Sequence, residues 1–154
     1  MKIEKIINEI GLNLPISSPP GAKYTPVKQC GNSLYVSGQI PLVDGKVFYT
    51  GKIGEERDLE YGEKAAKVCI INMLAALKNH LGDLDKIKNV TKLLAFVSSA
   101  NGFDKQHLVI NAASELLINI FGESGQHARS AIGVNQLPMD ATVEIEGIFE
   151  IWEA

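Results

Sequence analysis

Arg129 is the residue in this 154-residue chain whose type most needs a chemical explanation. The chain has 13 lysines and only two arginines, and Arg129 stands in a largely uncharged run, residues 127–133. A guanidinium is always charged and presents a planar fork of donors that matches a carboxylate or a phosphate. We predict that Arg129 binds an anion in a pocket. The alternative is a structural ion pair with a nearby glutamate, a common arrangement for a partly buried arginine.

Glu144 and Glu146 form a second candidate group. They alternate with Val143 and Ile145 in a run typical of a β-strand, so both carboxylates point to the same face. In a functional reading, Glu144 orients or activates a water molecule near the anion bound by Arg129. The alternative is that the two acids face solvent, or that one of them neutralises Arg129.

The remaining residue patterns do not indicate other common kinds of site. His80, His107 and His127 are far apart, and no His-x-x-x-His or Cys-x-x-Cys spacing occurs, so we predict no metal. Cys69 lies among apolar residues at helical spacing and is expected in the core. No glycine-rich phosphate loop is present, and we expect no cofactor.

Composition narrows the partners and the location. The formal net charge is −3 and the lysines are scattered, which argues against avid binding of nucleic acid. No apolar stretch approaches the length of a membrane span, and the first residues lack the pattern of a secretory signal. Two cysteines make no disulfide framework, so we expect reduced thiols and a cytoplasmic protein.

The periodicity of apolar residues predicts the elements that position these side chains. Helical spacing indicates helices over residues 3–10, over 59–81 and from Phe103 to about residue 120. Strands are predicted over residues 27–30, 34–37, 45–49, 87–98, 128–134 and 141–152. The order βββ-α-β-α-ββ predicts an α+β fold, with a mixed sheet and both long helices on one face. We expect one domain over residues 1–154, in which residues 1–19 add an N-terminal helix and a linker.

The predicted sheet is apolar on both faces. Leu94, Phe96, Val143, Ile145 and Ile148 are too apolar to leave either face in water. If both helices cover one face, a second subunit must cover the other, so the sequence predicts an oligomer.

Several short segments match a known pattern when they are taken together. They are Ala22-Lys23-Tyr24, Ser37-Gly38-Gln39-Ile40-Pro41, an early-helix Asn111, Arg129-Ser130-Ala131, Leu137-Pro138 and Glu144-Ile145-Glu146. From about Pro20 to its end, the chain resembles the YjgF/RidA family of reactive-intermediate deaminases. It departs from that family at Ala22-Lys23, where Gly-Pro is usual, and at Ala131, where a cysteine is frequent.

The resemblance implies a chorismate-mutase-like fold and a homotrimer with ligand clefts between subunits. It implies hydrolysis of 2-imino or 2-enamino acids to 2-oxo acids and ammonia, without a cofactor. Arg129 would hold the substrate carboxylate through two parallel bonds, and Glu144 would position water. Tyr24, Ser37, Gly38, Asn111 and the backbone of Ala131 would shape the cleft.

Two alternatives remain open at this point. One is a non-catalytic trimer that binds a carboxylate metabolite in the same cleft. The other is an endoribonuclease or translation inhibitor, an activity ascribed to some family members. The acidic net charge and the absence of a basic cluster count against the second alternative.

Overall fold

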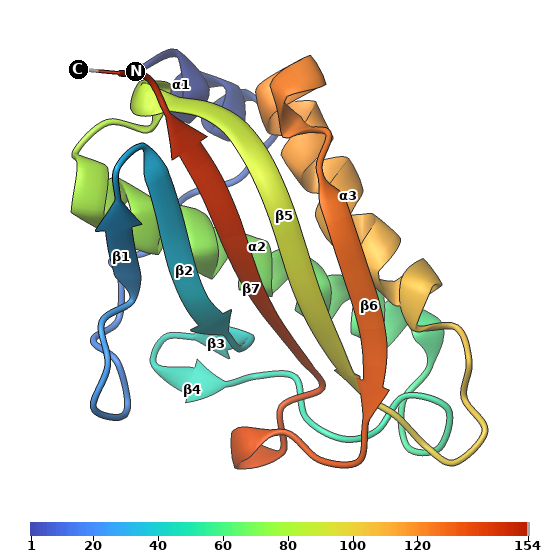
Figure 1. Ribbon diagram of the computed structural model, residues 1–154. Coiled ribbons are helices and arrows are strands. Elements are labelled where there is room, and N and C mark those ends of the chain that lie inside the picture. The colour runs from blue at the N-terminus through green and yellow to red at the C-terminus, as the bar shows by residue number, and fades with distance from the viewer. Residues whose placement is uncertain (154) are drawn as a thin grey trace.

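A mixed β-sheet with two long helices on one of its faces makes up most of the structure (Figure 1). This computed structural model describes residues 1–153; Ala154, the last residue of the predicted domain, lies outside the described residues. The strands of the sheet are β1 (Val27–Cys30), β2 (Ser33–Gln39), β5 (Ile87–Ser98), β6 (Ala128–Val134) and β7 (Val143–Ile151). The helices are α1 (Lys2–Glu9), α2 (Leu59–Leu81) and α3 (Gln106–Phe121), with short 3-10 turns η1 (Leu84–Lys86), η2 (Gly122–Gly125) and η3 (Pro138–Asp140).

The strand order is β1-β2-β7-β5-β6, which leaves β6 at one edge of the sheet. β5 and β6 run parallel and α3 connects them, whereas the other neighbouring strands of this sheet are antiparallel. Figure 1 shows α2 and α3 on the same side of the sheet. The predicted α+β class, with its mixed sheet and added N-terminal helix, is confirmed. None of the helices in residues 1–153 is both long enough and apolar enough to cross a membrane.

The predicted strand at residues 45–49 is different in the structure. A two-residue strand, β4 (Lys46–Val47), pairs there with β3 (Leu42–Val43) in a hairpin outside the main sheet. Asp44 and Gly45 connect them with φ angles of 52° and 77°, a left-handed backbone that suits a tight hairpin turn. The sequence signal for the turn was correct, but the turn closes on the neighbouring residues instead of extending the sheet.

Several predicted boundaries also differ by a few residues, and local structure explains two of them. α3 begins at Gln106 and not at Phe103, because a turn at Gly102, with a φ of 82°, precedes it and the N–H of Phe103 bonds to Ala100. β7 begins at Val143 and not at Ala141, because η3 fills the connection from β6.

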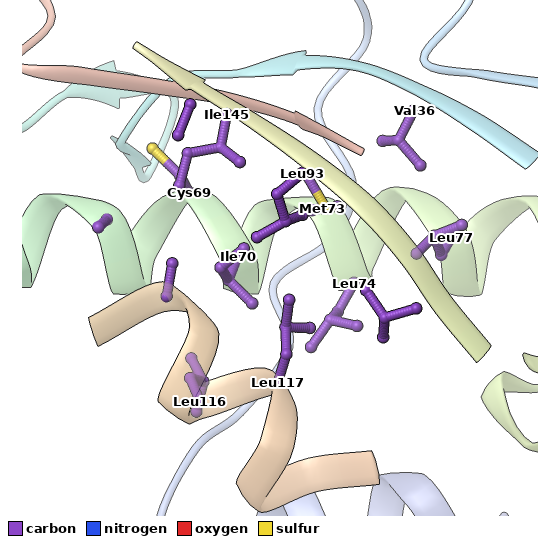
Figure 2. Close-up of a cluster of buried hydrophobic side chains, with 14 of the residues drawn as sticks. Val36, Cys69, Ile70, Met73, Leu74, Leu77, Leu93, Leu116, Leu117 and Ile145 are labelled. Atoms are coloured by element: carbon purple, nitrogen blue, oxygen red, sulfur yellow. The ribbon is translucent and has the colours of Figure 1, made fainter. Parts of the chain in front are cut away.

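The core lies between the sheet and the two helices (Figure 2). Ile70 and Met73 of α2 are fully buried against Leu93 of β5 and Ile145 of β7. A Cβ at Gly147 of β7 would lie 3.2 Å from the sulfur of Met73 and 3.3 Å from Leu93. The missing side chain at Gly147 therefore lets α2 approach the sheet closely.

The face of the sheet away from the helices carries both apolar and acidic side chains. Along β7, the buried Val143 and Ile145 face the helices, whereas the half-buried Glu144, Glu146 and Ile148 face the other way. Leu94 and Phe96 of β5 are in register with Glu146 and Glu144, so their side chains share that second face. We call it the open face, defined by Leu94, Phe96, Glu144, Glu146 and Ile148. Of the five apolar residues named in the sequence analysis, Val143 and Ile145 thus face the helices. Leu94, Phe96 and Ile148 lie on the open face.

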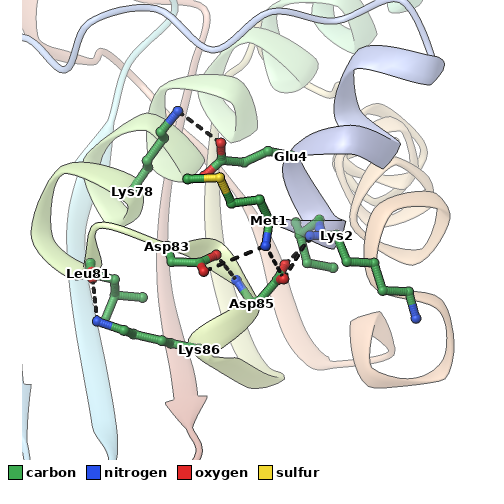
Figure 3. Close-up of polar contacts among 9 residues, drawn as sticks. Met1, Lys2, Glu4, Lys78, Leu81, Asp83, Asp85 and Lys86 are labelled. Carbon is green, nitrogen blue, oxygen red and sulfur yellow. Dashed lines mark hydrogen bonds and ion pairs between the residues drawn. The ribbon is translucent and has the colours of Figure 1, made fainter.

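Helix α1 is held at its first turn by polar contacts (Figure 3). Asp85 of η1 accepts hydrogen bonds from the backbone N–H groups of Lys2, at 2.7 Å, and Ile3, at 2.8 Å, and from the α-amino group of Met1. These donors, with the N–H of Ile3 first, lower the pKa of Asp85 to about 2. Asp85 thus caps α1 from another element, and the buried Ile7 fixes the other side of the helix.

Candidate functional site

A pocket of about 780 Å³ lies beside β7, between the linker that follows α1, β2 and η3. Four of the predicted site residues line it: Tyr24, Ser37, Gly38 and Glu144. Glu146 is also part of its wall. We call this group of five residues the acid pocket.

Ser37 ties the linker to β2 and thereby places Tyr24. Its backbone N–H donates to the carbonyl of Pro26 at 2.9 Å, and its hydroxyl donates to the carbonyl of Thr25 at 2.7 Å. Tyr24 remains exposed at the pocket wall. The Ser37 hydroxyl proton is therefore used within the chain, and its oxygen keeps accepting capacity for a ligand.

Gly38 lies directly against the Glu144 carboxylate. A Cβ at position 38 would stand 2.7 Å from Oε1 of Glu144, closer than real side chains approach. The pairing of β2 with β7 shifts register between Val36 and Gln39, so Gly38 sits in an irregular part of the ladder. Glycine is needed here to leave room for the carboxylate, not for an unusual φ.

The surroundings of Glu144 alter the acidity of its carboxyl group. Burial raises the pKa of Glu144, and the neighbouring negative charge of Glu146 raises it further. A carboxylate with a raised pKa accepts a proton more readily than an ordinary glutamate and still ionises as the pH rises. This environment fits the predicted role in positioning water and accepting its proton.

Arg129 is bound to α3 by three hydrogen bonds. Its Nη1 donates to the hydroxyl of Ser114 at 2.9 Å, and its Nη2 donates to Oδ1 of Asn111 at 2.8 Å and to the backbone carbonyl of His107 at 2.9 Å. Partial burial lowers the pKa of Arg129 from its usual value. The guanidinium stays charged. The three acceptors that fix its orientation are neutral groups of α3.

Ser114 is in turn held by His127, just before β6. Nδ1 of His127 lies 2.6 Å from the carbonyl of Gly125, and its Nε2 lies 2.9 Å from the Ser114 hydroxyl. A carbonyl only accepts, so Nδ1 carries the proton. In the neutral ring Nε2 then accepts from Ser114, whose lone pairs remain available for Arg129.

The bonds to α3 limit how Arg129 can hold a carboxylate. A guanidinium has about five N–H donors, and three are used by Ser114, Asn111 and His107. The others are the Nε donor and the second one on Nη1, which lie on different edges of the planar group. Two parallel bonds to a carboxylate from one edge would therefore need an N–H donor of Nη2. Both Nη2 donors are used by Asn111 and His107.

We call Arg129, His107, Asn111, Ser114 and Ala131 the arginine cluster. Asn111 was predicted as a residue of the cleft, but its hydrogen bond with Arg129 and those of His107 and Ser114 were not predicted. A signal was present in the sequence: positions 107, 111 and 114 follow the i, i+4, i+7 spacing of one helix face. The partnership depends on the packing of α3 against β6, which that spacing alone did not predict.

Ala131 follows Arg129 on the same face of β6 and is in register with Ala95 of β5. Its partly buried side chain packs against the core. Because β6 is the edge strand, the backbone groups that do not pair with β5 point outward. A role for the Ala131 backbone thus stays a prediction, and its side chain is structural.

The structure does not bring Arg129 and Glu144 together within one chain. Arg129 is in register with the buried Leu93 and shares the helix face, whereas Glu144 is in register with Phe96 on the open face. Within residues 1–153, no carboxylate lies within 4.0 Å of the Arg129 guanidinium. The alternative that Glu144 or Glu146 neutralises Arg129 within the chain is therefore wrong.

Comparison with known proteins identifies the family and the fold to which the chain is similar. The family described as "YjgF/chorismate mutase-like, putative endoribonuclease" matches residues 4–149. A crystal structure of a protein of unknown function from Agrobacterium tumefaciens is similar, with a TM-score of 0.92 and 46% identity over 98% of this chain and 93% of that one. The predicted chorismate-mutase-like fold is thereby confirmed.

Two known proteins are similar in sequence to this chain over almost their full lengths. The chain is 38% identical over 146 residues to Protein TCP17 from Trypanosoma cruzi, covering 94% of this chain and 91% of that protein. It is 30% identical over 141 residues to a 2-iminobutanoate/2-iminopropanoate deaminase from Dermatophagoides farinae, covering 91% and 94% of the two chains.

Proposed function

Because the chain belongs to the YjgF/RidA family, we propose that it hydrolyses 2-imino and 2-enamino acids to 2-oxo acids and ammonia. The site would be a cleft between two subunits of a homotrimer. The acid pocket of one subunit would face the arginine cluster of the next. Similarity to a relative named as a 2-iminobutanoate/2-iminopropanoate deaminase supports the choice of substrate class.

The observation that carries this proposal is the separation of the two groups within one chain. The acid pocket holds Glu144 and Glu146 and no cation, and the arginine cluster holds a charged guanidinium and no acid. The acid pocket thus lacks a cation and the arginine cluster lacks an acid. Glu144 and Arg129 point to opposite faces of the sheet. A head-to-tail contact around a threefold axis joins two different surfaces of identical subunits, which is the contact this arrangement needs.

The open face gives independent support for such a contact. Leu94, Phe96 and Ile148 lie on it only half-buried, and Tyr35 and Ile132 on the flanking strands β2 and β6 are exposed by 48% and 44%. Apolar side chains in this number on one sheet face favour a second protein layer. Packing this face against other subunits would bring β6 of one subunit toward β7 of the next.

The chemistry follows from the residues that meet there. Arg129 binds the substrate carboxylate, and Glu144 accepts a proton from water as the water oxygen bonds to C2 of the protonated imine. The carbinolamine nitrogen takes that proton back. The C2–N bond then breaks as the hydroxyl proton is lost to nitrogen, which leaves a 2-oxo acid and ammonium. Positioning and charge placement lower the barrier, since the imine carbon is already electrophilic.

The proposal is tested by generating 2-imino acids in solution and following the release of the 2-oxo acid. Substrates with short, branched and aromatic side chains would be compared with and without the protein, and with the Arg129→Ala and Glu144→Gln variants. We expect acceleration by the wild-type protein and loss of it in both variants. Release at the buffer rate for all side chains would contradict the proposal.

Two further assays, of carboxylate binding and of RNA cleavage, separate the other functions. A carboxylate that binds the wild-type protein without accelerated release would indicate a non-catalytic binder. RNA cleavage that persists in purified protein and weakens with salt would indicate the endoribonuclease that the family description includes. The net charge of −3 disfavours that outcome.

A further inference from the structure

Ser114 and His127 form, with Arg129, a chain of hydrogen bonds that links β6 to α3 and to the end of η2. The bonds run from Nη1 of Arg129 to the Ser114 hydroxyl, from that hydroxyl to Nε2 of His127, and from Nδ1 of His127 to the carbonyl of Gly125. Their lengths are 2.9, 2.9 and 2.6 Å. One assignment of donors and acceptors is consistent with all three hydrogen bonds.

We propose that Ser114 and His127 are positioning residues that set the orientation of the Arg129 guanidinium and thereby its affinity for the substrate carboxylate. This inference rests on the proposed function, in which Arg129 binds that carboxylate. Neither residue touches the substrate. They act through Arg129. The sequence motifs had predicted Arg129 as a site residue but neither Ser114 nor His127.

Fixing the Ser114 hydroxyl is the central step. A serine hydroxyl rotates freely, and one that turned its proton toward Arg129 would repel the guanidinium. With the neutral ring this is prevented, because Nε2 of His127 accepts the hydrogen bond from the Ser114 hydroxyl while Nδ1–H donates to the carbonyl of Gly125. Bonds in such a series also polarise one another, so the Ser114 oxygen becomes a better acceptor for Arg129.

Ordering Arg129 in advance favours binding of an anion. A free arginine side chain loses much of its rotamer freedom when it is immobilised. The bonds to Ser114, Asn111 and His107 already restrict it before a ligand arrives. Loss of the Ser114 bond would let Nη1 turn away, and the carboxylate would then bind to a less ordered group.

His127 offers a matched pair of substitutions. Glutamine places a carbonyl oxygen near the position of Nε2 and can still accept from Ser114. Asparagine places an N–H near Nδ1, so it keeps the bond to Gly125 and loses the acceptor for Ser114. The proposal requires His127→Gln to behave like wild type and His127→Asn to behave like Ser114→Ala. A residue needed only to hold the η2 turn through Gly125 would give the opposite order.

The test measures binding of pyruvate, a 2-oxo acid, to each variant by calorimetry, with Arg129→Ala as the reference for a lost site. One neutral hydrogen bond corresponds to roughly three- to tenfold in affinity, so Ser114→Ala and His127→Asn should bind about three- to tenfold more weakly. Ser114→Thr and His127→Gln should stay within about twofold of wild type. In turnover of a 2-imino acid, the two weakened variants should raise KM more than they lower kcat.

The outcomes separate this inference from the proposed function. If Arg129→Ala abolishes binding while Ser114→Ala and His127→Asn bind like wild type, the site stands and the positioning role is wrong. If Ser114→Thr loses as much as Ser114→Ala, packing is responsible and the role is again wrong. If wild type neither binds pyruvate nor turns over an imine, the proposed function fails and this inference with it.

Discussion

Among residues 1–153, Arg129 has no acidic partner, and its three hydrogen bonds go to neutral acceptors on α3. Lysine at this position keeps the charge but not the planar fork. A charge-assisted bond contributes about 1.5–3 kcal/mol, and about 1.4 kcal/mol is tenfold in rate. We therefore expect Arg129→Lys to lower kcat/KM about ten- to a hundredfold, measured by steady-state kinetics with an imine generated in situ.

The other arginine supplies the control for this substitution. Arg57 donates to the carbonyl of Thr50 at 2.9 Å and stacks on the ring of Tyr61, outside both proposed groups. Arg57→Lys should leave kcat/KM nearly unchanged. Since Arg129 also ties β6 to α3, a lower melting temperature for Arg129→Lys is expected in either case and does not identify its role. Equal turnover for both variants would make Arg129 structural.

Gly38 tests the position of the Glu144 carboxylate. A methyl group at position 38 would overlap Oε1 of Glu144, the mobile end of a side chain, so the carboxylate is expected to move while the fold is kept. Gly38→Ala should lower kcat at least about tenfold, since small displacements of catalytic groups are costly, with little change in melting temperature. Gly21→Ala is the control, because its Cβ would meet only Met139, at 4.0 Å. A Gly38→Ala variant with normal kcat would argue against Glu144 as the base.

The pH dependence tests the electrostatics of the acid pocket. Burial and, secondarily, Glu146 raise the pKa of Glu144, so activity that needs ionised Glu144 is lost as the pH falls through that raised value. Glu146→Gln removes one cause, and the acid limb of the kcat/KM profile should move to lower pH. Glu146→Asp keeps a negative charge and should move it less. An acid limb that stays in place or moves to higher pH would contradict this account.

Among the elements, α1 is attached by the Asp85 carboxylate, by the Glu4–Lys78 ion pair and by the buried Ile7. Because folding lowers the pKa of Asp85 from 3.8 to about 2, its contribution to stability is present above about pH 4 and is lost as the pH falls toward 2. Asp85→Asn should therefore reduce hydrogen-exchange protection of residues 2–9 at neutral pH, and the difference from wild type should shrink toward pH 2. Asp104→Asn, at an exposed position before α3, is the control. Equal protection in wild type and Asp85→Asn would show that Ile7 and the Glu4–Lys78 ion pair hold α1 without this carboxylate.

The elements that the sequence predicted well are those with a clear period. α2 is found at the predicted residues 59–81, because its apolar face repeats at helical spacing between the Asp58 cap and Gly82. β5 and β6 also match their predicted residues. The hairpin of β3 and β4 was not predicted, because strands of two residues have no period to detect. The capping of α1 by Asp85 joins positions more than 80 residues apart, a pairing that only tertiary packing defines.

At the level of the whole molecule, the sequence predicted which residues belong to a site but not how they are divided. Tyr24, Ser37, Gly38 and Glu144 line one pocket, whereas Asn111 lies with Arg129, and the resemblance had assigned all of them to one cleft. The division follows from strand register, because successive residues of a strand point to opposite faces of the sheet. Which face Arg129 and Glu144 take depends on how β6 and β7 pair with β5. Oligomerisation remains a prediction that rests on the apolar open face and on this division.

The cleft shared between subunits is the central claim, and complementation tests it most directly. Arg129→Ala and Glu144→Gln chains, each expected to be inactive alone, would carry different tags, be produced together and be purified through both tags. In a closed trimer of both kinds, one contact of three pairs an intact Arg129 with an intact Glu144 of the neighbour. We expect about a third of the wild-type kcat per trimer, with both single variants inactive. Mixed assemblies as inactive as the parents would contradict the shared cleft and place the site, if any, within one chain.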